Sequence, residues 1–316
     1  MKKIVIGIVS PCYNEESVLH ETANELSNLI QRLISKGKIS ENSFLAFVDD
    51  GSRDDTWKII SKLTEENSHI KGLKLSKNVG HQNALHAGLM HYHRIADALI
   101  SIDADLQDDI GVIEEMIDQF KDNNIQVVYG VRKERSTDTF FKKNTALFFY
   151  RLMRWMRVNL VYNHADFRLM SQKIIVALSQ YEEVNIFLRG IIPSIGFSSG
   201  IVYYNRQERR AGESKYPLKK MISFAWEGIT SFSNFPLKVV TMLSFCVFAL
   251  CILASLYALI SLYFTHVVPG WFSTVLPLYF LGGVQLLGLG IIGEYIGKIY
   301  SEVKKRPKYF VEESLN

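Results

Sequence analysis

The chain has 316 residues, with 36 Lys and Arg against 32 Asp and Glu, which gives a formal net charge of +4. This small excess argues against a nucleic-acid-binding protein, which needs a strongly basic surface. Hydrophobic residues make up 48% of the chain, and Asp, Glu, Lys and Arg are absent between positions 239 and 293. The distribution predicts a soluble domain followed by a membrane segment.

The first 130 residues alternate short apolar runs with longer amphipathic stretches. The runs that predict strands are Ile4–Val9, Phe44–Val48, Leu73–Leu75, Ala98–Ile102 and Gln126–Tyr129. The stretches with helical spacing and polar starts are Glu16–Ile34, Asp54–Glu66, Gly80–Ala96 and Asp109–Asp122. This alternation predicts an α/β domain in which helices cover a mostly parallel sheet.

Polar residues follow each of the first four predicted strands. They occupy positions 11–15, 49–52, 76–80 and 103–107. The carboxyl ends of parallel strands share one edge of a sheet, and ligands bind in the crevice there. The four clusters together therefore predict a binding site at that edge.

The pair Asp103 and Asp105 is the sharpest of these signals. In an extended segment residues i and i+2 point the same way, so both carboxylates can face one cation. Carboxylate and phosphate oxygens suit Mg²⁺ or Mn²⁺, which would neutralise a departing diphosphate. The alternative is a role in capping the helix that follows, and we assign that role mainly to Asp108 and Asp109.

The region 136–235 is less regular. Phe140–Leu160 mixes aromatic residues with five Lys and Arg residues, which is typical of a basic amphipathic helix lying against a membrane. A helix packed on the protein, with a solvated basic face, fits the same pattern. Both interpretations remain open on the sequence alone.

Two uncharged runs predict a transmembrane hairpin. Val239–Phe264 would span roughly 39 Å as a helix, against a hydrocarbon core of about 30 Å. Trp271–Gly293 forms the second run, and Lys residues flank the pair on both outer sides. Because positive charge favours the cytoplasmic side, both ends and the main domain are predicted to be cytoplasmic.

The polar clusters resemble a known family. Positions 10–16 (SPCYNEE), 48–52 (VDDGS), 78–80 (NVG) and 103–107 (DADLQ) resemble the nucleotide-sugar domain of family 2 glycosyltransferases. Positions 165–170 (ADFRLM), 210–216 (RAGESKY) and 293–298 (GEYIGK) narrow the resemblance to the polyprenyl-phosphate glycosyltransferases. The chain is most similar to the bactoprenol glucosyltransferases of bacteria and phage, relatives of dolichyl-phosphate mannose synthase. The resemblance covers essentially the whole chain.

The resemblance implies a GT-A (Rossmann-like) fold and a set of functional residues. The implied nucleotide-binding residues are Pro11, Tyr13, Glu15, Asp49, Asp50, Asn78 and Asp103. The implied ligands of Mg²⁺ or Mn²⁺ are Asp103, Asp105 and Gln107. The implied acceptor-phosphate residues are Arg132, Arg210, Ser214 and Lys215, and the implied catalytic set is Asp105, Asp166, Arg132, Arg210 and Lys215. Asp166 is expected to position the sugar or acceptor, with general-base catalysis as the weaker alternative.

The implied organisation has four parts. The cytoplasmic catalytic domain is 1–215, with its acceptor side in 130–215, and a juxtamembrane amphipathic segment covers 216–235. The two-helix hairpin occupies 236–300, and a cytoplasmic tail covers 301–316. The protein is thus expected to be a multi-pass component of the bacterial inner membrane that self-associates as a homo-oligomer.

The implied reaction is inverting transfer of a hexose, first glucose from UDP-glucose, to undecaprenyl phosphate at the cytoplasmic face. Other sugars (mannose, galactose, N-acetylhexosamine or aminoarabinose) remain alternatives. Processive polysaccharide synthases share the front half of the pattern, but Gln207–Arg210 lacks the Trp that completes their motif. A membrane protein that binds nucleotide-sugars without turnover is the alternative from a different functional class.

Overall fold

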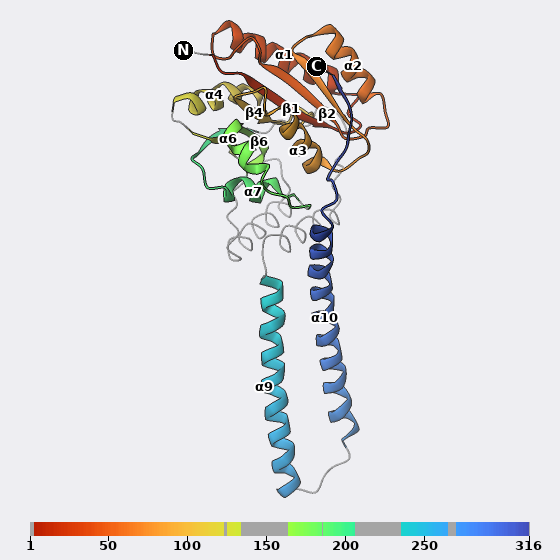
Figure 1. Ribbon diagram of the computed structural model, residues 1–316. Coiled ribbons are helices and arrows are strands. Elements are labelled where there is room, and N and C mark those ends of the chain that lie inside the picture. The colour runs from red at the N-terminus through yellow and green to blue at the C-terminus, as the bar shows by residue number, and fades with distance from the viewer. Residues whose placement is uncertain are drawn as a thin grey trace. The chain divides into compact units, whose positions relative to one another are not determined.

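The computed structural model describes residues 3–122, 125–133, 164–184, 186–205, 235–264 and 270–315. The chain divides into two compact units. The sheet unit comprises Met1–Trp155, Asn159–Pro217 and Lys305–Asn316. The helical unit comprises Met156–Val158 and Leu218–Lys304. Figure 1 shows the chain coloured from its N-terminus to its C-terminus.

An eight-stranded sheet organises the first unit, in the order β7-β5-β6-β4-β1-β2-β3-β8. Its strands are β1 Ile6–Cys12, β2 Phe44–Asp49, β3 Ile70–Leu75, β4 Ala98–Ser101, β5 Val127–Arg132, β6 His164–Ser171, β7 Ser199–Tyr204 and β8 Val311–Leu315. β6 runs antiparallel to β4 and β5, β8 runs antiparallel to β3, and the remaining pairs are parallel. The predicted mostly parallel sheet is confirmed.

Helices connect the strands as the periodicity predicts. They are α1 Leu19–Ser35, α2 Thr56–Glu66, α3 His81–Tyr92, the 3-10 turn η1 Ile110–Val112, α4 Ile113–Asp122, α6 Gln172–Leu178 and α7 Leu188–Ser194. The four helices predicted between positions 16 and 122 are confirmed, with ends that differ by a few residues from the prediction. The third strand begins at Ile70 rather than Leu73, because the half-buried lysines at positions 71 and 74 interrupt its apolar pattern.

Alternate residues of each central strand face opposite helical layers. The main core joins α1, α2 and α4 to Ile8, Phe47 and Ile100 of the sheet. On the opposite face of the sheet, Gly88 of α3 lies so close to Val9 and Val48 that an added Cβ would be 2.6 Å from a side-chain atom of each. Helices therefore cover both faces of the sheet, and its carboxyl edge remains the place where polar loops gather.

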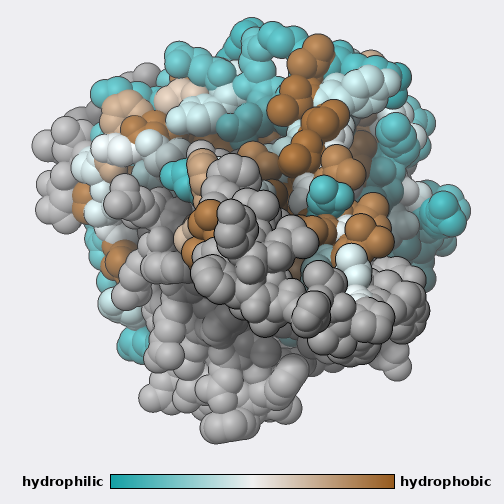
Figure 2. Space-filling view, turned by 90° about the horizontal axis from the view of Figure 1, so that it is seen from below, coloured by the Kyte–Doolittle hydropathy of each residue, from teal (hydrophilic) through white to brown (hydrophobic). Residues whose placement is uncertain are grey.

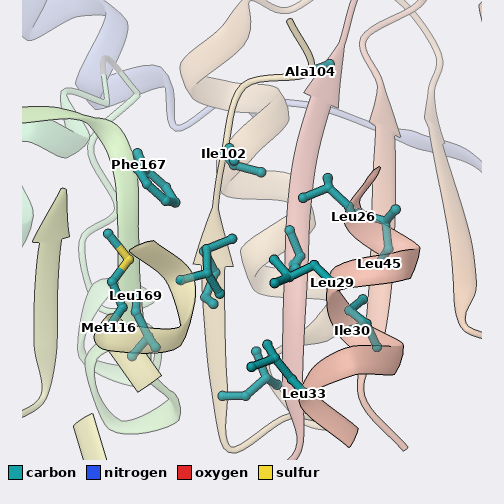
Figure 3. Close-up of a cluster of buried hydrophobic side chains, with 14 of the residues drawn as sticks. Leu26, Leu29, Ile30, Leu33, Leu45, Ile102, Ala104, Met116, Phe167 and Leu169 are labelled. Carbon is teal, nitrogen blue, oxygen red and sulfur yellow. The ribbon is translucent and has the colours of Figure 1, made fainter. Parts of the chain in front are cut away.

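Four side chains of α1 show how the core forms (Figure 3). Leu26, Leu29, Ile30 and Leu33 recur at helical spacing, are at most 2% exposed, and belong to the same buried cluster as Leu45 of β2. Burying each such side chain contributes about 1.5–3 kcal/mol. This packing holds the first two βα units together.

The last described residues add a strand to the sheet. β8 pairs with β3, with Leu73 opposite Ser314 and Gly72 opposite Leu315. In Figure 1 the C-terminus lies beside the strands of this unit. The sequence predicts only a tail here, because the five residues of β8 include three polar ones and show no buried face.

The helical unit contains α9, Phe235–Phe264, and α10, Trp271–Lys304. The two predicted apolar helices are confirmed, and α10 continues beyond Gly293 to Lys304. Among the described residues, Phe280–Lys304 is long and apolar enough to cross a membrane, and Phe235–Val247 is a shorter apolar stretch.

Large apolar side chains are exposed along both helices of this unit. They include Met242, Phe245, Leu250, Leu253, Leu256, Leu278, Leu286, Leu289, Ile296 and Val303. Figure 2, which views the molecule from below, shows brown hydrophobic residues at the surface with teal hydrophilic ones around them. Large exposed apolar side chains along two long helices suit contact with lipid rather than with water. The predicted Phe140–Leu160 helix and nearly all of the juxtamembrane segment lie outside the described residues.

Candidate active site

Hydrogen bonds join the loops after β1 and β2 at the carboxyl edge of the sheet. The amide of Asn14 donates to Ser52 Oγ at 3.0 Å, and Asn14 Oδ1 accepts from the amide of Arg53 at 2.9 Å. The amide of Glu15 donates to Thr56 Oγ1 at 3.0 Å. The predicted nucleotide-binding residues Tyr13 and Glu15 therefore lie in one braced loop beside the end of β2, and Pro11 lies near the end of β1.

Asp49 ends β2 and is completely buried. Its Oδ1 accepts from the amide of Ser52 at 3.2 Å, while its Oδ2 has no hydrogen-bond partner among the described residues. Burial raises the pKa of Asp49 above its ordinary value. Because a buried acceptor without a partner is costly, this oxygen suits a donor group on a ligand.

Asp50 holds the loop that precedes α3. Its two carboxylate oxygens accept from the amides of Val79 at 2.7 Å and Gly80 at 3.0 Å. The adjacent Gly51 has a φ of 65°, and an added Cβ would lie 2.5 Å from the Lys77 backbone. The loops after β2 and β3 are therefore tightly packed, which fixes where α3 begins.

The Asp103–Gln107 loop follows β4. Thr22 Oγ1 donates to the Ala104 carbonyl at 2.7 Å, and the amide of Gln107 donates to Asp105 Oδ1 at 3.2 Å. Leu106 has a φ of 52°, a left-handed conformation that a leucine adopts only when its surroundings enforce it. The strained turn fixes the direction of the two carboxylates.

In this loop, Asp103 presents a buried carboxylate oxygen that is suited to bind a cation. Its Oδ1 is buried, lies 3.4 Å from His81 Nε2, and accepts no hydrogen bond among the described residues. Burial raises the pKa of Asp103, with the neighbouring charges of Asp166 and Asp105 adding to the effect. No group of three or more His, Cys, Asp or Glu side chains in the described ranges could hold a metal alone. A cation here would need oxygens from its substrate as well.

Asp166 lies opposite this loop because β6 is antiparallel to β4. Arg168 pairs with Ser101, and Ser101 Oγ donates to the Asp166 carbonyl at 2.5 Å. The first residues of β6 thus lie where β4 ends. Asp166 and Asp103 are therefore brought to the same edge of the sheet.

Two guanidinium groups hold the Asp166 carboxylate. The fully buried Arg168 donates to Oδ1, and Arg189 of α7 donates to Oδ1 at 3.2 Å and to Oδ2 at 2.8 Å. Gln82 of α3 lies 3.4 Å from Oδ2 and also accepts from the amide of Leu188 at 3.1 Å. Burial alone would raise the pKa of Asp166, but the charges of Arg189 and Arg168 outweigh it and hold the pKa well below its ordinary range.

Arg132 ends β5 and belongs to a second buried cluster. Its Nε donates to Tyr204 Oη at 3.2 Å, and Tyr204 Oη donates to Asp108 Oδ1 at 2.5 Å. Arg132 Nη2 lies 3.6 Å from the same carboxylate oxygen. The capping role assigned to Asp108 is therefore wrong, since its buried carboxylate faces Arg132 and Tyr204. Asp109 does cap the next turn, because it accepts from the amide of Gly111 at 2.9 Å.

For the other predicted site residues the structure gives the position in the fold and the exposure, or nothing. Asn78 is exposed in the loop after β3, and Gln107 is buried beside Asp105. Arg210, Ser214 and Lys215 lie outside the described residues.

The structure adds four site residues: His81, Gln82, Arg168 and Arg189. His81 and Gln82 directly follow the Asn78–Gly80 motif, and Arg168 lies within the ADFRLM segment. All three residues therefore lay in or beside a motif that the sequence shows. Arg189 had no such motif and was only a lone charge in an apolar stretch.

Two parts of the chain match known protein families. Residues 7–178 match the sequence profile of glycosyl transferase family 2, and residues 235–299 match the GtrB C-terminal hairpin. The chain is 52% identical over 311 residues to the uncharacterized glycosyltransferase YkoT of Bacillus subtilis, covering 98% of this chain and 92% of that protein. It is 38% identical over 314 residues to the SfII prophage-derived bactoprenol glucosyl transferase of Shigella flexneri, covering 98% of both.

A solved structure of a mycobacterial protein matches the fold with a TM-score of 0.51 and 14% identity, covering 72% of this chain and 73% of that one. The family profile spans more than half of the chain, and all four polar segments (11–15, 49–52, 76–80 and 103–107) lie within it. The chain therefore belongs to glycosyl transferase family 2 and is a glycosyltransferase with the GT-A fold.

Proposed function

We propose that this enzyme transfers glucose from UDP-glucose to undecaprenyl phosphate, with inversion at the anomeric carbon. The observation that carries the proposal is the match along nearly the whole chain, catalytic part and hairpin together, to proteins named bactoprenol glucosyl transferase. Family 2 membership alone would leave the acceptor open, whereas the match to the GtrB hairpin supports a lipid one.

The donor would lie along the carboxyl edge between β1 and β4. Asp49, with its unpartnered buried Oδ2, is suited to accept a hydrogen bond from the uracil ring. Pro11, Tyr13, Glu15 and Asn78 would line the nucleoside side. Asp50 would act mainly by holding the 79–80 amides, so its direct contact with nucleotide remains a prediction.

The residues present fit a divalent cation. Asp103 has an unpartnered buried oxygen, and Asp105 follows it at the i+2 position, so both could hold Mg²⁺ or Mn²⁺ together with diphosphate oxygens. Gln107 would contribute an amide oxygen to the same site. When bound, the cation would neutralise charge on the leaving diphosphate.

The chemistry would rest on alignment and charge stabilisation. A phosphate oxygen of the acceptor would attack the anomeric carbon, forming the new C–O bond as the bond to the nucleoside diphosphate breaks. An acceptor phosphate is already anionic near neutral pH, so its attack needs no proton removed. Arg132, Arg210, Ser214 and Lys215 are proposed to bind phosphate oxygens, because guanidinium and ammonium groups stabilise such charge.

The apolar helices would keep the catalytic unit beside its lipid acceptor, which raises the effective concentration of the two reactants. Lys238 precedes the hairpin and Lys298, Lys304, Lys305 and Arg306 follow it, so both ends are proposed to be cytoplasmic. Labelling of a Gly270→Cys variant, free of other cysteines, by an impermeant maleimide should occur only from the outer side. Self-association is proposed as well, and mass determination in detergent would test it.

The function is tested with purified protein, radiolabelled undecaprenyl phosphate, Mg²⁺ or Mn²⁺, and a panel of UDP- and GDP-sugars. Product should form from UDP-glucose, and a chelator or the Asp105→Asn variant should abolish it. Asp118→Asn, an exposed carboxylate on α4, is the matched control and should leave the rate unchanged. Product from another sugar would overturn the donor assignment. Donor binding without any lipid product would overturn the reaction and favour a nucleotide-sugar sensor.

A further inference from the structure

Two partly exposed guanidinium groups at the site each pair with a buried carboxylate. The Arg189 side chain is 32% exposed and pairs with Asp166, which is 6% exposed. The Arg132 side chain is 21% exposed and faces Asp108, which is 2% exposed. In both pairs the acid lies beneath the surface and the cation reaches it. Such an arrangement fixes a positive charge in place before any ligand arrives.

The Asp166 carboxylate is held by two guanidinium groups that differ in exposure. It accepts from Arg168, which is completely buried, as well as from Arg189. Arg168 is fully buried, so Arg189 is the guanidinium that reaches the surface of the cluster, close to Asp103 as well. A carboxylate held by two guanidinium groups is a poor proton acceptor, which argues that Asp166 orients Arg189 instead of acting as a base.

This cluster adjoins the metal-binding carboxylates. His81 Nε2 lies 3.4 Å from Asp103 Oδ1 and 3.7 Å from Asp166 Oδ2, so one imidazole separates the two acids. Arg189 reaches the same Asp166 oxygen from the opposite element, α7, at 2.8 Å. Arg189 is thus close to the reacting centre but lies on the side of β6 and α7, away from the nucleoside loops of β1 and β2.

We propose that Arg189 binds the phosphate of the lipid acceptor, together with Arg132, and that Asp166 is a positioning residue for Arg189. The proposal rests on the function proposed above. The donor diphosphate is already served by the carboxylate pair and its cation. Direct displacement requires the incoming oxygen on the side of the anomeric carbon opposite the leaving diphosphate. We assign that side to the Asp166 cluster, where Arg189 is the partly exposed cation.

Steady-state kinetics and nucleotide binding of Arg189→Gln and Arg189→Lys test the assignment. Loss of a charged hydrogen bond to phosphate should raise KM for undecaprenyl phosphate by about 10–100-fold in Arg189→Gln. The Kd for UDP with Mn²⁺ should change by less than about twofold, because UDP lacks the acceptor. Arg189→Lys should recover part of the loss, since it keeps the charge without the planar fork. Exposed Arg94→Gln, at the end of α3, is the control and should match wild type.

The outcomes separate this inference from the reaction itself. A weaker UDP Kd with an unchanged acceptor KM would assign Arg189 to the donor diphosphate and overturn the proposal. A fall in the thermal midpoint and in kcat alone would give Arg189 a merely structural role, which also overturns it. If wild-type enzyme makes no lipid product, the proposed function fails first. If wild type is active and Arg189→Gln is equally active, only the present inference fails.

Discussion

Arg168 of β6 is a fully buried cation, and its hydrogen bonds offset the free-energy cost of burying its charge. Its guanidinium donates to Asp166 and lies 3.4 Å from the Leu188 carbonyl, and its Nε has no partner among the described residues. Taking a charge out of water costs several kcal/mol unless it is paired. The stability of this part of the sheet therefore depends on Asp166 remaining ionised.

Asp166→Asn should lower the free energy of unfolding by about 3–5 kcal/mol, because it leaves Arg168 buried without its counter-ion. The Asp166 pKa is lower folded than unfolded, so its contribution is complete above the unfolded pKa of about 3.9. The contribution is lost as pH falls below that value toward the folded pKa. Urea unfolding in detergent between pH 3 and 8 would measure the difference between wild type and variant.

The control for that experiment is Asp118→Asn, whose carboxylate pairs with Lys38 but is 43% exposed. An exposed pair is worth about 0–1 kcal/mol, so this variant should be nearly neutral at every pH. If Asp166→Asn cost no more than Asp118→Asn, the two guanidinium groups would not depend on Asp166 as argued.

At the scale of elements, the turn after β2 is where backbone conformation and packing coincide. Gly51 and Gly37 both have left-handed φ values, 65° and 69°. An added Cβ at Gly51 would lie 2.5 Å from the Lys77 backbone, whereas nothing lies within 4 Å of one at Gly37. The two positions therefore separate conformational strain from steric overlap.

Gly37→Ala should cost about 1–2 kcal/mol of unfolding free energy, which is the penalty for a left-handed alanine. Gly51→Ala should cost a further 1–3 kcal/mol or so, because backbone atoms must move. It should also weaken UDP binding, since the displaced 77–80 loop is the one that Asp50 holds. Unfolding curves and UDP titration of both variants would measure this, and equal effects at the two glycines would contradict it.

The elements differ in how far the sequence predicts them. β1 to β5 and α1 to α4 were predictable because apolar period and polar strand ends agree along each βα unit. Asp49, Asp103 and Asp105 were identifiable because each follows a predicted parallel strand, whereas Asp166 was identified only through the family resemblance. Arg189 and Asp108 were not identifiable, since their roles depend on which side chains α7 and β7 place against them. No local pattern specifies such long-range pairings.

At the scale of the whole molecule, the chain leaves α10 at Lys304 and rejoins the sheet at Val311. Side chains attach this segment at several points of the sheet unit. Lys305 pairs with Glu182 at 2.5 Å, Glu312 with Lys74 at 2.9 Å, and Trp57 Nε1 donates to Glu313 at 3.1 Å. β8 also covers the edge of β3, which would otherwise present unpaired backbone groups to solvent.

A chain that ends at Phe310 should therefore open β3 without disturbing the centre of the sheet. Amide hydrogens of Ile70–Leu75 should exchange faster in the truncated protein, while those of Ala98–Ser101 should stay protected. The matched control, Glu312→Ala with Glu313→Ala, removes the side-chain contacts but keeps the strand, so β3 should exchange nearly as in wild type. Unchanged β3 exchange after truncation would mean that β8 adds nothing to the sheet. Faster exchange in the control as well would assign the protection to the side chains rather than to backbone pairing.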